Sequence, residues 1–190
     1  KLEVPDILYY DKDVKNAYLL TKEIKGSALN AGKYQENPET AVKILAKGLL
    51  KFSSVDIKNC PFDNRLEKKL EKAAENVRLN KVNMKNWEKT THFSDPGSLL
   101  DYLYCNKPAE NEYVFTHGDY CLPNIIGNDR GSVGFVDLGR AGIADIWQDI
   151  SLCIRSLHHN FETGKYDDLF LKYLNKPFDS KKVEYYILLD

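Results

Sequence analysis

The sequence has no long hydrophobic run and no excess of charge of either sign. Its 190 residues contain 27 Lys and Arg against 28 Asp and Glu, so the formal net charge is −1. Such a chain has no basic field for nucleic acid or an anionic membrane surface. No apolar segment reaches the roughly 20 residues that span a bilayer, and no window resembles a signal peptide. We therefore expect a cytoplasmic protein that binds neither nucleic acid nor membrane.

Cysteine is scarce and shows no pairing pattern. The four cysteines form no CxxC pair and have no regular spacing; they are Cys60, Cys105, Cys121 and Cys153. A chain of this length can bury a core without disulfides, so reduced thiols are expected. The chain begins without Met and stops at Asp190 within an amphipathic run. We interpret both ends as cut and expect a fragment.

The apolar pattern predicts that helices dominate. The Asn37-Pro38 pair supplies a cap and a first-turn proline, and apolar residues recur at helical spacing as far as Phe52. A second such start lies at Asp95-Pro96 and predicts a helix to about Leu103. Further helices are expected over residues 64–77, 146–161, 166–174 and 180–189, with the chain helical again after Gly142.

Short strands are expected at two places. Residues 7–10 and 17–21 are apolar runs around a charged turn, which predicts a hairpin. Residues 113–116, 123–126 and 133–136 predict three more short strands, with residues 128–131 as the turn between the last two.

The most informative segment carries three polar residues in a fixed order. Asp119 and Asn124 are five residues apart in a His-x-Asp-x-x-x-x-Asn pattern, and Asp137 follows within Asp-Leu-Gly. This is the spacing of kinase catalytic loops, in which one carboxylate orients the attacking hydroxyl. An amide oxygen and a second carboxylate can hold the Mg²⁺ ions that bridge the phosphates. The alternative is that all three are turn-forming residues.

Two neighbouring residues favour structural roles. His117 stands where kinase loops carry a structural histidine, so we expect a buried ring bonded to backbone rather than a catalytic group. Asp149 lies on the helix that follows, and we expect it to hold the loop through backbone N–H groups.

Along nearly its whole length the sequence resembles the aminoglycoside 3'-phosphotransferases, the kanamycin and neomycin kinases. The segments that carry the resemblance are residues 117–125, 134–140, 142–145, 148–150 and 185–190, with 59–62 and 86–88 in addition. The His-Gly-Asp segment alone is shared with choline, homoserine and other small-molecule kinases. The blocks at 134–150 and 185–190 are more specific.

The resemblance implies an α+β, mainly helical fold: a protein-kinase-like C-terminal lobe with small β-hairpins. Residues 1–21 would be a remnant hairpin of the N-terminal nucleotide lobe, 22–26 the hinge, and 27–190 the catalytic and substrate-binding lobe. The implied reaction moves the γ-phosphate of ATP or GTP to an aminoglycoside hydroxyl, which confers antibiotic resistance. The implied partners are therefore a nucleotide and an aminoglycoside, with Mg²⁺ as cofactor.

The resemblance also assigns residues. Asp119 would be catalytic, and Asn124 and Asp137 would bind magnesium. The hinge residues Lys22, Glu23 and Ile24 would receive the nucleotide. The acceptor would lie near Arg140, Arg155, Glu88 and Asp190. The arginines can orient neighbouring carboxylates, and structural ion pairs are the alternative.

The sequence departs from this family in three features. No Gly-rich phosphate loop and no strand lysine with its helix glutamate precede Lys1, so we expect the chain alone to be inactive. The family's acidic tail beyond Asp190 is absent. Residues 81–85 replace an acidic loop of some relatives, where only Glu88 keeps its charge. Another small-molecule kinase of the same fold, such as a choline or homoserine kinase, or an inactive binding module, remains an alternative.

Overall fold

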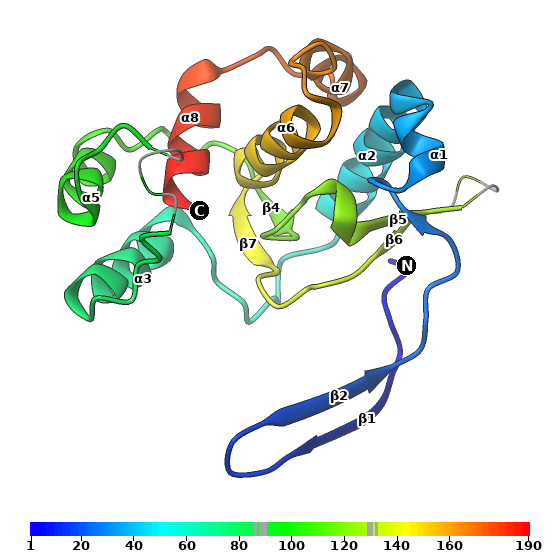
Figure 1. Ribbon diagram of the computed structural model, residues 1–190, viewed down its shortest axis with the longest axis horizontal. Helices are drawn as coiled ribbons and strands as arrows, with labels where there is room; N and C mark the ends of the chain where they lie inside the picture. Colours follow the sequence, from blue (N-terminus) through cyan, green and yellow to red (C-terminus); the bar gives the residue numbers. More distant parts are fainter. Residues whose placement is uncertain (86, 88–90, 129–130, 132) are drawn as a thin grey trace.

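The computed structural model describes residues 1–85, 87, 91–128, 131 and 133–190. It consists of a helical body and a hairpin that extends away from it (Figure 1). Strands β1 (Ile7–Lys12) and β2 (Ala17–Thr21) form this antiparallel hairpin, with Lys12 opposite Ala17. The predicted hairpin is thus confirmed, although β1 continues two residues beyond the expected end.

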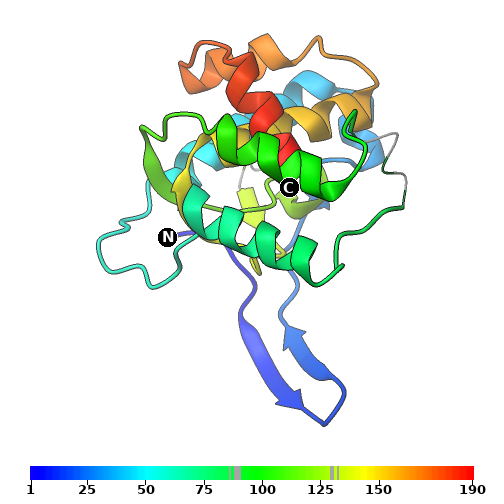
Figure 2. The same ribbon diagram turned by 90° about the vertical axis from the view of Figure 1, so that its left-hand side faces the viewer.

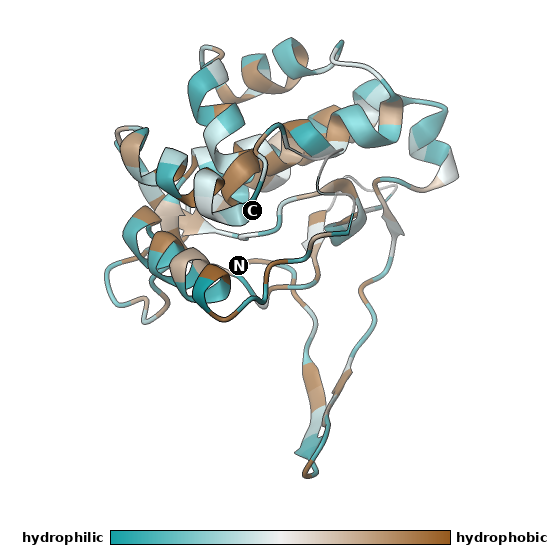
Figure 3. Ribbon diagram, turned by 60° about the vertical axis from the view of Figure 1, so that its left-hand side comes forward, coloured by the Kyte–Doolittle hydropathy of each residue, from teal (hydrophilic) through white to brown (hydrophobic). Residues whose placement is uncertain are grey.

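The β1–β2 hairpin has no core of its own. Its apolar side chains face solvent, with Ile7 68% and Leu19 60% exposed, and Figure 3 shows hydrophobic residues along both strands. The segments that precede and follow the hairpin both lie against the body. In the preceding segment, the Glu3 carbonyl accepts a hydrogen bond from the Phe135 N–H at 2.9 Å.

Helix α2 (Pro38–Ser53) lies at one side of the body in Figure 1 and buries one of its faces in the core. It begins as predicted, because the Asn37 side chain accepts a hydrogen bond from the Thr40 N–H and Pro38 occupies the first turn. Its buried face ends at Phe52, whose ring stacks on Phe115 at 5.2 Å and meets Phe135 edge-on at 4.9 Å. The core therefore joins α2 to the strands that carry the polar motif.

Two small strand groups lie beside α2. Strand β4 (Tyr113–Thr116) pairs antiparallel with β7 (Gly142–Asp145). Strand β5 (Ile125–Gly127) lies between β6 (Val133–Phe135) and the short β3 (Ser27–Ala28). Strand β4 ends just before the polar motif, β5 begins directly after Asn124, and β6 ends two residues before Asp137. The pairings of these strands therefore position both ends of the motif.

Two expectations for this region were wrong. Residues 142–145 form buried strand β7 rather than leading directly into a helix. The strand expected from residue 123 starts at Ile125, because Leu122–Asn124 form the 3-10 helix η1. Pro123 fits the first turn of η1, where its missing N–H removes no helical hydrogen bond.

The remaining helices enclose the strands. Helices α6 (Trp147–Phe161), α7 (Asp167–Leu174) and α8 (Ser180–Leu189) follow β7, and α6 packs against α8. Helices α3 (Leu66–Arg78) and α5 (Pro96–Cys105) lie beside α8 (Figure 2), and α1 (Gly32–Gln35) precedes α2. The predicted α8 is confirmed at both ends. In the part of the chain that the structure describes, no helix is both long and apolar enough to cross a membrane.

Candidate phosphotransfer site

The loop of residues 117–124, called the His-Gly-Asp loop below, connects β4 to β5. Its start is held by Asp149, whose carboxylate accepts hydrogen bonds from the His117 N–H at 2.6 Å and the Gly118 N–H at 2.9 Å. Asp149 is fully buried, and this burial raises its pKa to about 6 against the opposing effect of the two N–H groups. The prediction that Asp149 holds this loop through backbone N–H groups is confirmed.

His117 is a structural residue of the loop. Its ring is buried, and Nε2 lies 2.9 Å from the Val136 carbonyl oxygen. A carbonyl can only accept, so Nε2 carries the hydrogen and Nδ1 is left to accept the weaker bond from the Asp119 N–H at 3.4 Å. Burial lowers the pKa of His117, which favours this neutral form. The expectation of a buried ring bonded to backbone is confirmed.

The three motif residues converge at the end of this loop. The Asn124 amide nitrogen donates to the Asp119 carbonyl at 3.0 Å and to the Asp119 carboxylate at 3.2 Å. The backbone carbonyl of Asn124 accepts a hydrogen bond from the backbone N–H of Val136 at 3.0 Å. This bond brings Asp137, the next residue, close to Asn124. Asp137 is exposed and has a left-handed backbone with φ of 57°. The site thus presents two carboxylates and an amide oxygen at one edge.

Gly118 brings the loop against the segment after Asp137. Its φ is +82°, and a Cβ at this position would lie 2.0 Å from the Arg140 carbonyl oxygen. A side chain here would therefore collide with backbone, not with a movable group. This close approach links the motif residues to Arg140.

The expected hinge residues lie on the other side of the motif. Ile24 is half-buried against β6, since a Cβ on Gly134 would come within 2.6 Å of the Ile24 side chain. Lys22 and Glu23 are exposed, and the Lys22 N–H donates to the Asp6 carbonyl at 2.9 Å. Ile24 therefore packs against β6, the strand that precedes Asp137, whereas Lys22 and Glu23 lie at the surface.

Three of the four expected acceptor residues form one cluster. Asp190 accepts from Arg140 at 2.8 Å and from Arg155 at 2.7 Å, one arginine for each carboxylate oxygen. The Asp190 side chain is only 13% exposed, whereas the side chains of Arg140 and Arg155 are more exposed to solvent. The fourth expected residue, Glu88, lies outside the described residues.

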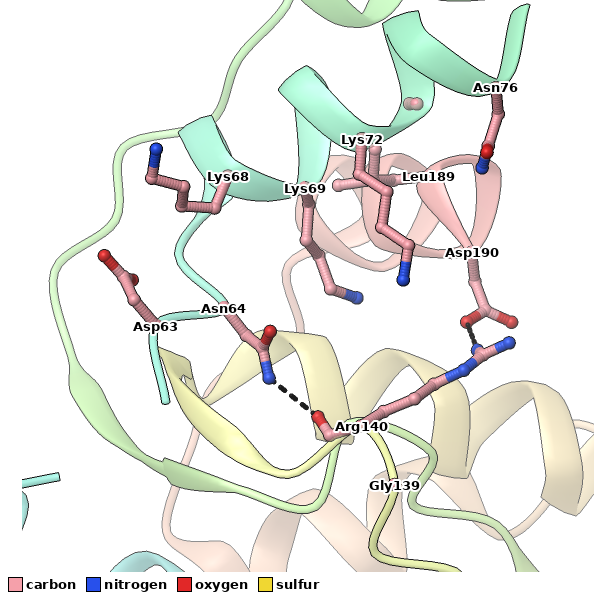
Figure 4. Close-up of a pocket in the computed structure, with 11 residues that line it drawn as sticks. Asp63, Asn64, Lys68, Lys69, Lys72, Asn76, Gly139, Arg140, Leu189 and Asp190 are labelled. Atoms are coloured by element: carbon pink, nitrogen blue, oxygen red, sulfur yellow. Dashed lines mark hydrogen bonds and ion pairs between the residues drawn. The ribbon is translucent and has the colours of Figure 1, made fainter. Parts of the chain in front are cut away.

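A pocket of about 340 Å³ lies beside this cluster, between α3 and the end of α8, and is called the α3–α8 pocket below (Figure 4). Arg140 and Asp190 form part of its wall, and Asn64 donates to the Arg140 carbonyl at 2.8 Å. Lys69 and Lys72 extend from α3 into the same space. The sequence predicted a charged helix in this region but did not show which of its faces points inward. These two lysines were therefore not predicted as pocket residues.

A larger cavity of about 660 Å³ adjoins the α3–α8 pocket and shares Ala73, Asn76, Leu189 and Asp190 with it. Its walls are mainly apolar and include Trp87 and Leu103. Asp190 therefore lies at the junction of a polar space and an apolar one. Together they form one continuous space that reaches Gly139 and Arg140.

The donor atoms near Asp137 suit magnesium better than a transition metal. Among the residues described, no three His, Cys, Asp or Glu side chains gather as a metal-binding group. Asn124 directs its amide nitrogen to Asp119, so its amide oxygen is not used in that bond, and the backbone bond from Val136 to Asn124 brings Asp137 into the same region. One amide oxygen and one carboxylate fit Mg²⁺, which keeps much of its coordination for phosphate oxygens and water.

The fold and this arrangement define the class: a kinase-like lobe in which a loop carboxylate, Asp119, is hydrogen-bonded to Asn124 next to the segment that carries Asp137. Comparison with known proteins agrees. The model of the phosphotransferase enzyme family matches residues 1–186. Aminoglycoside 3'-phosphotransferases of Niallia circulans and Enterococcus faecalis are 41% and 39% identical over the whole chain, which covers 72% and 73% of them.

A solved structure extends the comparison to the fold. The crystal structure of an aminoglycoside 3'-phosphotransferase of type VIII superposes with a TM-score of 0.85 at 27% identity, covering 99% of this chain and 73% of that one. The chain belongs to the aminoglycoside 3'-phosphotransferases of the phosphotransferase enzyme family.

Proposed function

We propose that this protein transfers the γ-phosphate of ATP or GTP to a hydroxyl of an aminoglycoside and so confers resistance to it. The observation that carries the proposal is the hydrogen bonding of Asn124 to Asp119 within the His-Gly-Asp loop, together with the bond from the Val136 N–H to the Asn124 backbone carbonyl, which brings the residue before Asp137 to the same place. The acceptor-side cluster lies directly beside them through the contact of Gly118 with Arg140. Such a reaction uses the cytoplasmic nucleotide pool, so we place the protein in the cytoplasm.

Asp119 is proposed as the catalytic carboxylate. It orients the acceptor hydroxyl and accepts its proton as the hydroxyl oxygen attacks the γ-phosphorus, while the bond to the β-phosphate oxygen breaks and the nucleoside diphosphate leaves. Asn124 supports this role by donating to the Asp119 carboxylate, which fixes its orientation. Asn124 and Asp137 would hold Mg²⁺, which neutralises charge on the phosphates.

The nucleotide is proposed to lie against residues 22–26 as a hinge, with residues 1–21 on the nucleotide side and 27–190 as the catalytic lobe. The backbone of Lys22, Glu23 and Ile24 would receive the base. The packing of Ile24 against Gly134 supports this, because it positions the segment against β6, which ends two residues before Asp137.

The acceptor is proposed to bind at Asp190, with Glu88 as a second carboxylate. Arg140 and Arg155 fix both oxygens of Asp190, so this carboxylate presents a defined orientation to the pocket. Their role is to position Asp190 rather than to contact a cation directly.

The test is a coupled assay of nucleoside diphosphate release with kanamycin, neomycin, choline and homoserine, each with ATP and GTP, made on a form of the protein that also carries a Gly-rich phosphate loop and strand lysine, because residues 1–190 alone are expected to be inactive. We expect turnover with the aminoglycosides and none with the other two acceptors. Turnover with choline or homoserine alone would assign the protein to another small-molecule kinase of this fold. Aminoglycoside binding without any turnover would leave a binding module.

A further inference from the structure

Asn64 links the entrance of α3 to the segment that follows Asp137. Its amide nitrogen donates a hydrogen bond to the Arg140 carbonyl oxygen at 2.8 Å (Figure 4). Asn64 lies two residues before α3 and Arg140 lies between β6 and β7, so the bond joins positions 76 residues apart. Among the residues that the structure describes, Asn64 is the one hydrogen-bond donor to this oxygen. The orientation of the Arg140–Ala141 peptide therefore depends on the Asn64 side chain.

The backbone around Asn64 does not depend on its amide. This segment runs beside β7, where the Ile143 N–H donates to the Phe62 carbonyl at 2.8 Å. The Asn64 N–H in turn donates to the Ile143 carbonyl at 2.9 Å. Gly142 leaves room for the amide, because a Cβ there would lie 2.5 Å from Asn64 Nδ2. Removal of the amide would thus leave the segment paired with Ile143 and the Arg140 carbonyl without its donor.

The Arg140 carbonyl also lies against the His-Gly-Asp loop. A side chain on Gly118 would collide with this oxygen, and Asp119 is the next residue of the loop. Reorientation of the Arg140–Ala141 peptide would therefore move the surface on which Gly118 rests, directly beside the proposed catalytic carboxylate. A misplacement of about 1 Å between reacting groups can cost about a hundredfold in rate.

The acceptor side has a second support that Asn64 does not control. Arg140 donates to one oxygen of Asp190 at 2.8 Å, but Arg155 on α6 donates to the other at 2.7 Å. Asp190 would therefore keep the bond to Arg155 if Arg140 moved. Loss of the Asn64 amide should disturb the position of the acceptor relative to Asp119 more than the affinity for the acceptor.

We propose that Asn64 is a positioning residue for phosphate transfer: by holding the Arg140 carbonyl, it sets the spacing between the His-Gly-Asp loop and the acceptor wall. The inference rests on the proposed function, because it assigns a role within the same reaction. Asn64 also lines the α3–α8 pocket, so direct contact with the acceptor is the competing explanation. Contact would change acceptor affinity, whereas positioning changes mainly the turnover of the bound complex.

The experiment compares kcat with the dissociation constant of kanamycin, measured by calorimetry, in the form of the protein used for the turnover assay. The variants are Asn64→Ala, which removes the amide, and Asn64→Leu, which fills a similar space but has no donor. The matched control is Asn106→Ala, because the Asn106 amide also donates to a backbone carbonyl, that of Tyr102 at 2.9 Å, at the exposed end of α5. The melting temperature is measured for every variant.

We expect both Asn64 variants to lower kcat by about ten- to a hundredfold, while the dissociation constant changes by less than about threefold. Asn106→Ala should leave both values unchanged. The melting temperature should fall by no more than about 4 °C in each variant, the scale of one lost hydrogen bond in a chain of this size.

Three results would overturn the inference. Normal kcat in Asn64→Ala would show that the amide has no part in the reaction, and recovery of kcat by Asn64→Leu would assign the effect to packing. An affinity loss as large as the loss of kcat would make Asn64 a binding residue. Loss of folding in both Asn64 variants would make its role structural and would overturn the inference as well.

Turnover of the unmodified protein separates this inference from the proposed function. If it phosphorylates choline or homoserine but no aminoglycoside, the proposed function fails, and the same comparison made with that acceptor decides the role of Asn64. If it phosphorylates aminoglycosides and Asn64→Ala is equally fast, only the positioning role fails. Absence of turnover with every acceptor would overturn both.

Discussion

The β1–β2 hairpin and the His-Gly-Asp loop are both short non-helical segments, but they are held by different kinds of contact. Within the hairpin the Asp13 side chain accepts from the Lys15 and Asn16 N–H groups and from the Tyr18 hydroxyl, all within five residues. The loop is held by Asp149, which is 31 and 32 residues from its bonding partners. One segment is shaped locally and the other by the folded body.

This difference predicts where stability and activity are coupled. The hairpin has exposed side chains and few contacts with the body, so changes there should alter neither the core nor the motif geometry. The loop is buried, and its backbone N–H groups depend on one distant carboxylate. Disturbing that carboxylate should therefore affect stability and catalysis together. Four experiments test the contrast.

The largest expected effect is on turnover. We expect Asp119→Ala, made in the form of the protein used for the turnover assay, to lower kcat by at least about two orders of magnitude, the usual scale for a positioned acid–base group. The melting temperature should stay nearly unchanged, because the half-buried Asp119 does not hold the loop to the body. Steady-state kinetics and calorimetry check both parts. Near-normal turnover in this variant would exclude Asp119 as the catalytic carboxylate.

The next effect is on folding. Asp149→Ala leaves the buried N–H groups of His117 and Gly118 without an acceptor, and each such loss costs about 1–3 kcal/mol. We expect the free energy of unfolding to fall by about 2–4 kcal/mol in denaturant titrations, and turnover to fall as the loop moves. Asp168→Ala, at an exposed position on α7, serves as control. Equal stability of both variants would mean that the loop does not depend on Asp149.

A smaller effect should appear as a dependence on pH. The pKa of Asp149 is raised to about 6 in the fold, from 3.8 in an unperturbed carboxyl. Between these values the folded state binds the proton that the unfolded state has released, so this group's contribution to stability falls as pH rises. The loss should be on the order of 2 kcal/mol, after allowance for the approximate size of the shift.

Asp149→Asn tests this dependence, since an amide has no such titration. Its free energy of unfolding should vary less between pH 4 and 6 than that of the unmodified chain. The lowered pKa of His117 contributes the opposite slope in both proteins, so the difference between them is the quantity to measure. Parallel pH profiles would contradict the assignment.

The smallest effect is expected in the hairpin. Leu19→Ser in the chain of residues 1–190 should change the free energy of unfolding by less than about 0.5 kcal/mol, as is usual for exposed positions. Phe52→Ala, which empties the core beside Phe115 and Phe135, should cost about 3–5 kcal/mol. A large loss from Leu19→Ser would show that the hairpin packs against the body after all.

The sequence could predict the features that depend on local pattern. Asn37 and Pro38 mark the start of α2, and the short apolar run of residues 113–116 marks β4, because caps and short apolar runs act within a few residues. The kinase-loop spacing also located Asp119, Asn124 and Asp137. His117 and Asp149 received the correct structural roles from the loop pattern and their positions beside it.

Features that depend on distant pairing could not be obtained in this way. Strand β7 is four residues long and follows a turn, and it is strand-like only because β4 lies beside it. The inward orientation of Lys69 and Lys72 depends on how α3 is rotated against α8, which no local spacing specifies. The same holds for the meeting of Arg140 and Arg155 at Asp190, across 50 and 35 residues of sequence.

The close approach of Gly118 to the Arg140 backbone has a consequence for how such an enzyme can diversify. Since even a methyl group at residue 118 would strike a carbonyl oxygen, the two loops cannot drift apart or together by gradual substitution there. The His-Gly-Asp loop and the Arg140 segment therefore have to change together. The side chains of α3 and α8 that line the α3–α8 pocket take no part in the contact between Gly118 and the Arg140 backbone, so they can vary without disturbing it.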